Sequence, residues 1–110
     1  TGVCEDKIVP PDLEAIRQAF RESTYILTDH AAKRGLARRI TRLEIEQAVL
    51  NGEVIEDYPE DKYSPSCLIY GRTDQGRLLH VQVSYPPGVK VITVYEPDPA
   101  EWVDYRNRRP

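Results

Sequence analysis

The sequence predicts an α+β fold in which N-terminal helices pack on one face of a roughly four-stranded antiparallel sheet. The first half of the chain repeats apolar residues at helical spacing, whereas residues 76–97 are rich in the valine, isoleucine, threonine and tyrosine typical of strands. A turn at Tyr85-Pro86-Pro87-Gly88 divides this later stretch into two strands and predicts a hairpin. A length of 110 residues then suits one layer of helix on one sheet.

Three helices are predicted in the first half. The first covers about residues 12–22, where the apolar residues recur every three or four positions. The second begins after Thr28, a good N-cap, and is expected to be interrupted at Gly35, since glycine disfavours a helix interior. The third begins at Thr41, which forms a capping box with Glu44.

The remaining elements complete a single predicted domain over residues 1–110. Strands are expected at residues 54–58 and 66–71, before the hairpin. A capping pattern with proline at the first helical position predicts a short closing helix and a basic tail within residues 98–110. Residues 1–9 have no clear period and are expected to form an N-terminal arm.

Charge and composition limit the function classes. A formal net charge of −3 argues against a protein that coats nucleic acid through its phosphates. The basic residues nevertheless gather in the helical half, while an acidic run lies at residues 53–61. That run lacks the spacing of a calcium loop, so solvated surface or partner binding is the better interpretation. Cys4 and Cys67 form no zinc pattern, and no cofactor is predicted. No membrane span or signal peptide is recognised, which predicts a cytoplasmic protein.

The two histidines are the candidate proton-transfer groups. His30 lies in the first turn of its helix, with Arg34 one turn later on the same face. Strand alternation places His80 on the more polar face of the sheet, where Tyr95 and Tyr70 are expected to join it. Such a cluster suits RNA cleavage without metal: imidazoles transfer the protons, and an arginine offsets charge on the phosphate.

Each of these residues also has a structural interpretation. A histidine near a helix N-terminus is often a hydrogen-bonded structural group, and His80 also suits cross-strand packing. Helix arginines such as Arg34 and Arg38 are often solvated, and Tyr95 also suits a half-buried core position. The convergence of the two imidazoles is therefore the deciding geometry.

Several motifs in the chain resemble those of a family of short bacterial proteins catalogued as a domain of unknown function. The similarity extends over about residues 25–102. The motifs are Thr28-x-His30-Ala31-x-x-Arg34, Gly52-Glu53-Val54-Ile55-Glu56-Asp57-Tyr58-Pro59, Pro65-Ser66-Cys67-Leu68 with Gly71, Gly76-Arg77-x-Leu79-His80-Val81, and Ile92-Thr93-Val94-Tyr95-Glu96-Pro97-Asp98-Pro99.

This family resembles the RelE-, ParE- and BrnT-like toxins, whose broader fold group includes barnase-type ribonucleases. The resemblance implies a toxin-like domain, possible RNA as substrate and a cognate antitoxin, including YgiT-like zinc-binding ones, as partner. By position it implies His30, His80 and Tyr95 as catalytic residues. It implies Arg34, Arg38 and Tyr70 as substrate-binding residues.

Two positions depart from the family pattern. Gly35 stands where a bulky apolar residue is usual, and Arg39 stands where glycine is usual before Ile40. An arginine in a left-handed helix cap costs on the order of 1 kcal/mol.

The resulting hypothesis is a toxin of a toxin–antitoxin system that acts as a metal-independent endoribonuclease. The rival hypothesis is a non-catalytic protein–protein interaction module. The ribonuclease requires the His30 and His80 side chains in one open cleft. The interaction module instead expects them apart, together with an apolar surface patch or an unpaired strand edge.

Overall fold

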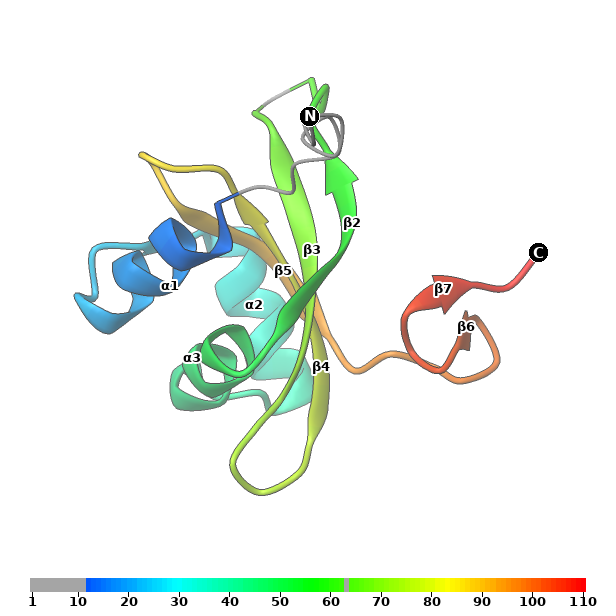
Figure 1. Ribbon diagram of the computed structural model, residues 1–110. Helices are drawn as coiled ribbons and strands as arrows, with labels where there is room; N and C mark the ends of the chain where they lie inside the picture. The colour runs from blue at the N-terminus through cyan, green and yellow to red at the C-terminus, as the bar shows by residue number, and fades with distance from the viewer. Residues whose placement is uncertain (1–11, 63) are drawn as a thin grey trace.

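The computed structural model describes residues 12–62 and 64–110 and contains three helices on one side of a sheet (Figure 1). The predicted arm at residues 1–9 lies outside this described part. The helices are α1 (Leu13–Arg21), α2 (Asp29–Arg38) and α3 (Arg42–Leu50). The N-caps of the three helices are Asp12, Thr28 and Thr41, each of which accepts a backbone hydrogen bond with its side chain. The predicted capping box between Thr41 and Glu44 is confirmed.

The main sheet has five strands in the order β1-β5-β4-β3-β2. The strands are β1 (Ile26–Leu27), β2 (Glu53–Tyr58), β3 (Ser66–Arg72), β4 (Leu78–Ser84) and β5 (Lys90–Tyr95). Strands β2 to β5 pair antiparallel as predicted, and β4 and β5 form the predicted hairpin. The α+β class is therefore confirmed, but the sheet is mixed because β1 adds a parallel edge to β5.

The core lies between the helices and one face of this sheet. Alternate residues of β4, namely Leu79, Val81 and Val83, are fully buried there, as the alternation predicted. The register between β4 and β5 skips Ile92, so that Val91 and Val94 both reach the core.

Helix α3 approaches the sheet closely because glycines lie beneath it. A Cβ atom on Gly71 would lie 1.8 Å from the Ala48 carbonyl oxygen, and one on Gly52 would lie 2.5 Å from the same oxygen. These two glycines of the sequence motifs are therefore explained by helix–sheet packing.

Helix α2 differs from the sequence prediction at Gly35, whereas its C-terminal end agrees with the prediction. It continues through Gly35, which is buried, and a Cβ atom there would lie 3.0 Å from the Ile40 carbonyl oxygen. The expected interruption is thus wrong, because tight packing outweighs the low helix propensity of glycine. Arg39 adopts the left-handed conformation with φ of 56°, as its position in the glycine pattern suggested.

The C-terminal segment forms a hairpin instead of the predicted closing helix. Strand β6 (Trp102–Val103) pairs antiparallel with β7 (Asn107–Arg108), and the two turn residues Asp104 and Tyr105 both have positive φ. We call residues 98–110 the cap. In Figure 1 the cap lies beyond the end of β5, on the side of the sheet away from the helices. Tertiary contacts of Trp102 and Tyr105 outweigh the local helix signal.

Candidate functional site

His80 lies beneath the cap and is completely buried. Its Nε2 atom is 2.7 Å from the carbonyl oxygen of Tyr105, and its Nδ1 atom is 3.2 Å from the hydroxyl of Tyr95. A carbonyl oxygen only accepts, so Nε2 carries the proton and Nδ1 accepts from the Tyr95 hydroxyl. Burial lowers the pKa of His80, which keeps the ring neutral, although the Tyr105 hydrogen bond opposes that shift.

Aromatic rings surround this imidazole. The Trp102 ring meets it edge-on with centroids 4.4 Å apart, and Tyr95 and Tyr70 lie at 5.3 and 5.7 Å. The expected grouping of His80, Tyr95 and Tyr70 on one face is therefore present. Burial also raises the pKa of Tyr95, so its hydroxyl stays protonated and donates to His80.

Two arginines attach the cap to the acidic strand β2. Arg106 pairs with Glu53 at 2.5 Å, and Arg108 pairs with Glu56 at 3.0 Å. These carboxylates belong to the acidic run that the sequence assigned to surface or partner binding. Two of the five carboxylates in that run are therefore neutralised by the cap.

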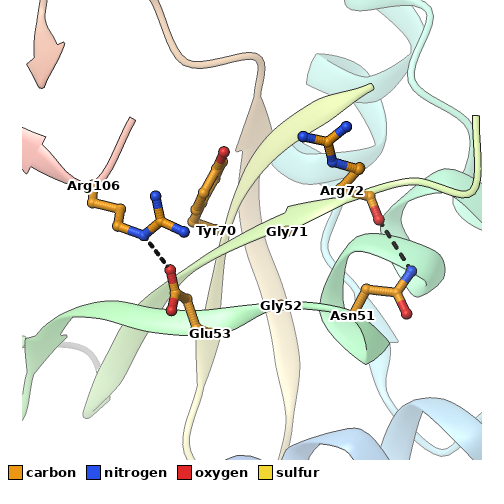
Figure 2. Close-up of a pocket in the computed structure, with 7 residues that line it drawn as sticks. All are labelled: Asn51, Gly52, Glu53, Tyr70, Gly71, Arg72 and Arg106. Atoms are coloured by element: carbon orange, nitrogen blue, oxygen red, sulfur yellow. Dashed lines mark hydrogen bonds and ion pairs between the residues drawn. The ribbon is translucent and has the colours of Figure 1, made fainter. Parts of the chain in front are cut away.

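Tyr70 lies at the edge of this cluster, beside an open groove of about 390 Å³ (Figure 2). The Arg106 guanidinium lies over the Tyr70 ring, 5.0 Å from its centroid, and Tyr105 stacks on the same ring at 6.2 Å. Arg72 lines the groove as well. The ring of Tyr70 is thus occupied by the cap rather than open to a substrate.

The other candidate residues lie along helix α2, beside strand β5. His30, Arg34 and Arg38 recur every four residues and so form one stripe, about 12 Å long at 1.5 Å per residue. The Arg34 Nε atom is 3.4 Å from His30 Nε2, and Arg38 donates to the Val94 carbonyl at 3.0 Å. His30 lines a hollow that includes Ser84, whereas Arg38 lines a separate one.

The expected convergence of His30 and His80 on one open cleft is wrong. His30 is exposed on α2, while both ring nitrogens of His80 are engaged beneath the cap. Alternation along β4 directs His80 away from the helices, so α2 and this ring cannot meet. Among the candidate residues, Arg38 and Tyr95 are brought to one hollow, which they line with Glu96 and Glu101.

The cations of α2 and of its C-cap differ from most others in the described residues, because none has a carboxylate partner there. Salt bridges of the described chain involve Arg17, Arg21, Arg42, Arg77, Arg106 and Arg108. Lys33, Arg34, Arg38 and Arg39 are all exposed and take part in none of these pairs. The surface of α2 therefore carries positive charge that the described fold does not neutralise.

Arg77 is a residue whose role the sequence did not reveal. Its guanidinium donates to the carbonyls of Arg38 and Arg39 at 3.0 and 2.7 Å, and it pairs with Glu44 and Glu96. It thereby ties the C-terminal end of α2 to α3 and to the end of β5. Its place in the Gly76-Arg77 motif was the available signal, but the partners are distant in sequence.

No metal or reactive-thiol site is visible in the described residues. No group of three histidine, cysteine, aspartate or glutamate side chains is placed there to hold a metal ion. Cys67 is a buried free thiol whose pKa is raised to about 12 by burial, so it is unreactive. Cys4 lies outside the described residues. In residues 12–62 and 64–110, every helix is too short or too polar to cross a bilayer.

The protein is a small α+β domain. Helices cover one face of its sheet, and the short cap covers part of the other. The chain belongs to the family described as Domain of unknown function (DUF4258), whose model matches residues 27–96. No significant match was found among curated proteins or solved structures. The resemblance to RelE-, ParE- and BrnT-like toxins stays a prediction.

Proposed function

We propose that this chain is a protein–protein interaction module whose α2 surface binds an acidic partner. The observation that carries the proposal is the set of α2 cations without carboxylate partners in the described chain. Opposite charge across an interface accelerates association and selects the partner. The toxin resemblance makes an antitoxin the natural candidate for that partner.

An exposed leucine favours a protein over a nucleic acid as the partner. Leu36 lies on the outer surface of α2, between Lys33 and Arg39, and is 82% exposed. An apolar side chain of this size suits a protein contact, whereas a phosphate backbone gains nothing from it. The net charge of −3 agrees, because a long nucleic acid would meet repulsion elsewhere on the molecule.

The α2 surface is also held rigidly enough to select a partner. Arg77 fixes its C-terminal end, and the Thr28 hydroxyl donates to the Val91 carbonyl at its N-terminal end. Ala31 and Gly35 pack against the core between these ends. Little conformational freedom of the helix backbone is therefore lost when a partner binds.

The test compares two probes on matched variants. Binding of a labelled peptide of alternating glutamate and leucine, and of a labelled single-stranded oligouridine, is measured by fluorescence anisotropy. Lys33→Gln/Arg34→Gln should weaken peptide binding by about tenfold. The control Arg21→Gln/Arg42→Gln also removes two cations, but both already face a carboxylate, and it should change binding less than about twofold.

Tighter binding of the oligouridine than of the acidic peptide would contradict the proposal. Equal losses in the two double variants would also contradict it, because they would show that total charge rather than the α2 surface controls binding.

A metal-independent ribonuclease is the second candidate, favoured by the hollow that Arg38 and Tyr95 share with Glu96 and Glu101. There Arg38 would contact a phosphate, and a carboxylate would take the proton of the 2′-hydroxyl. The Tyr95 hydroxyl would turn from His80 Nδ1 and protonate the leaving oxygen. His80 would act as a positioning residue behind Tyr95. Cleavage of the same oligouridine that is lost in Tyr95→Phe and retained in His30→Ala would support this candidate, and an intact oligouridine would refute it.

A further inference from the structure

The cap depends on the sheet beneath it for its conformation. Its two strands have two residues each, too short to be stable alone. Asp104 and Tyr105 have φ of 54° and 61°, a conformation unfavourable for residues with a side chain. The carbonyl of Tyr105 is also the group that accepts the His80 hydrogen bond. This hairpin therefore adopts its shape because the sheet surface holds it, as a bound peptide would.

The surface that holds the cap lies wholly within the family region, and the cap lies outside it. Glu53, Glu56, Tyr70, His80 and Tyr95 all fall within residues 27–96, the range matched by the family model. The cap begins at residue 98. The binding surface thus belongs to the region that the family model describes, whereas its occupant lies beyond the matched residues.

We propose that the sheet surface under the cap is a peptide-binding site and that the cap is its tethered occupant. The ligand class is a peptide segment that carries an aromatic residue followed by arginines. Trp102 supplies the aromatic ring against His80, and it is only 3% exposed. The ion pairs of Arg106 and Arg108 with β2 supply the charge. A segment from a partner protein with the same groups competes for the same surface.

The chemistry of the surface excludes other ligand classes. The carboxylates of Glu53 and Glu56 line its edge and repel a phosphate, so a nucleic acid is disfavoured. The His80 Nε2–H group provides a donor for a peptide carbonyl, and Tyr70 provides a ring on which a guanidinium stacks, as Arg106 does in Figure 2. The surface therefore suits a ligand that offers a backbone carbonyl, an aromatic ring and a guanidinium, and a peptide carries all three groups.

The test uses the full chain and a labelled peptide of residues 98–110 that carries Trp102→Phe. Trp102 is the single tryptophan of the chain, so its emission reports release of the chain's own cap, while anisotropy reports peptide binding. A tethered cap competes at an effective concentration of about a millimolar, so the wild type should bind the peptide weakly. Arg106→Gln/Arg108→Gln in the full chain should loosen the cap, strengthen peptide binding on the order of tenfold and shift Trp102 emission to the red.

A matched variant breaks the same ion pairs from the other side. Glu53→Gln/Glu56→Gln also loosens the cap, but it damages the site, so peptide binding should not strengthen. Arg21→Gln, which removes an ion pair on α1, should behave as the wild type. If circular dichroism shows that Arg106→Gln/Arg108→Gln is poorly folded, the single variant Arg108→Gln is used in its place. Equal peptide binding by the arginine and glutamate variants, or no binding to the arginine variant at about a millimolar peptide, would overturn the proposal.

Discussion

The cap and helix α2 both carry exposed arginines, but only those of the cap form salt bridges within the described chain. In the cap, Arg106 and Arg108 each face a carboxylate of β2, and each also lies over an aromatic ring. On α2, Lys33 and Arg34 face no carboxylate in the described chain. Cap arginines hold the molecule to itself, whereas α2 cations remain available to another molecule.

The difference shows that a count of basic residues does not locate a binding surface. The sequence contains both groups, and their composition is similar. The role of a basic residue depends on whether it has a carboxylate partner within the chain. A paired arginine helps to hold an element in place, whereas an unpaired exposed arginine is available for association with another molecule. Variants that separate these roles test the comparison.

The largest effect is expected from His80→Ala, which removes the ring at the centre of the cap contacts. It leaves the Tyr105 carbonyl without its donor and opens a cavity beside Trp102. Together these should lower the free energy of unfolding by about 2–4 kcal/mol. Urea denaturation followed by Trp102 fluorescence measures this loss.

His30→Ala is the control on the α2 side. His30 is exposed, and within residues 12–62 and 64–110 its side chain bonds only to Arg34, at 3.4 Å, so the change should stay within about 0.5 kcal/mol. Similar losses in the two variants would show that the cap cluster is no more structural than the α2 stripe.

The next effect is a loss of stability in mild acid that depends on His80. Burial lowers the pKa of His80 in the folded protein. Below the ordinary histidine pKa of about 6.5, His80 is therefore protonated in the unfolded chain but stays neutral in the folded chain. Stability is complete above that pH and should fall as the pH drops from it towards the lowered pKa. Glu56 and Arg108 are the charged groups that act on the ring, with opposite effects.

Urea midpoints at neutral and mildly acidic pH check this prediction. His80→Gln, which keeps an amide N–H but does not titrate, should lose much less stability over the same range. An identical decline in wild type and His80→Gln would assign the acid sensitivity to other groups.

A smaller effect separates the two arginine groups directly. Arg106→Gln/Arg108→Gln should lower the urea midpoint slightly, and less so at high salt, because these pairs are partly exposed and therefore screened. Lys33→Gln/Arg34→Gln should leave the midpoint unchanged at either salt concentration. A stability loss from the α2 variant equal to that from the cap variant would remove the distinction.

The smallest effect is a gain of stability from Arg39→Gly. Arg39 has φ of 56°, which glycine adopts without strain. The strain energy that glycine relieves in the folded protein exceeds the stability lost through its greater conformational entropy in the unfolded chain. The free energy of unfolding should rise by about 0.5–1 kcal/mol, while binding of the acidic peptide weakens because one α2 cation is lost. Thermal melting and anisotropy measure the two changes. A variant less stable than the wild type would show that the Arg39 side chain makes a contact that stabilises the fold.

Sequence reasoning located most helices and strands because their signals are local. The Thr41 capping box, the alternation around Val81 and the turn before Val89 each act within a few residues. The parallel strand β1 was missed because two residues carry no period, and only pairing with β5 makes them a strand. The closing helix was wrong because burial of Trp102 against His80 outweighs a capping pattern.

The candidate site was predicted in part. Strand alternation correctly grouped His80 with Tyr95 and Tyr70, and helical spacing correctly aligned His30 with Arg34. The cap that covers the face of the sheet to which His80 points could not be derived from spacing. Arg77 was missed for the same reason, since its partners lie 33 to 39 residues earlier and 19 residues later.

The amino-acid sequence alone determined where the chain turns, which residues begin its helices and which face of β4 is apolar, because these depend on neighbouring residues. Tertiary structure alone decided which histidine is buried and which arginines are paired. Both outcomes depend on contacts between segments far apart in the chain, where the loss of hydration must be offset by partners that no local pattern specifies.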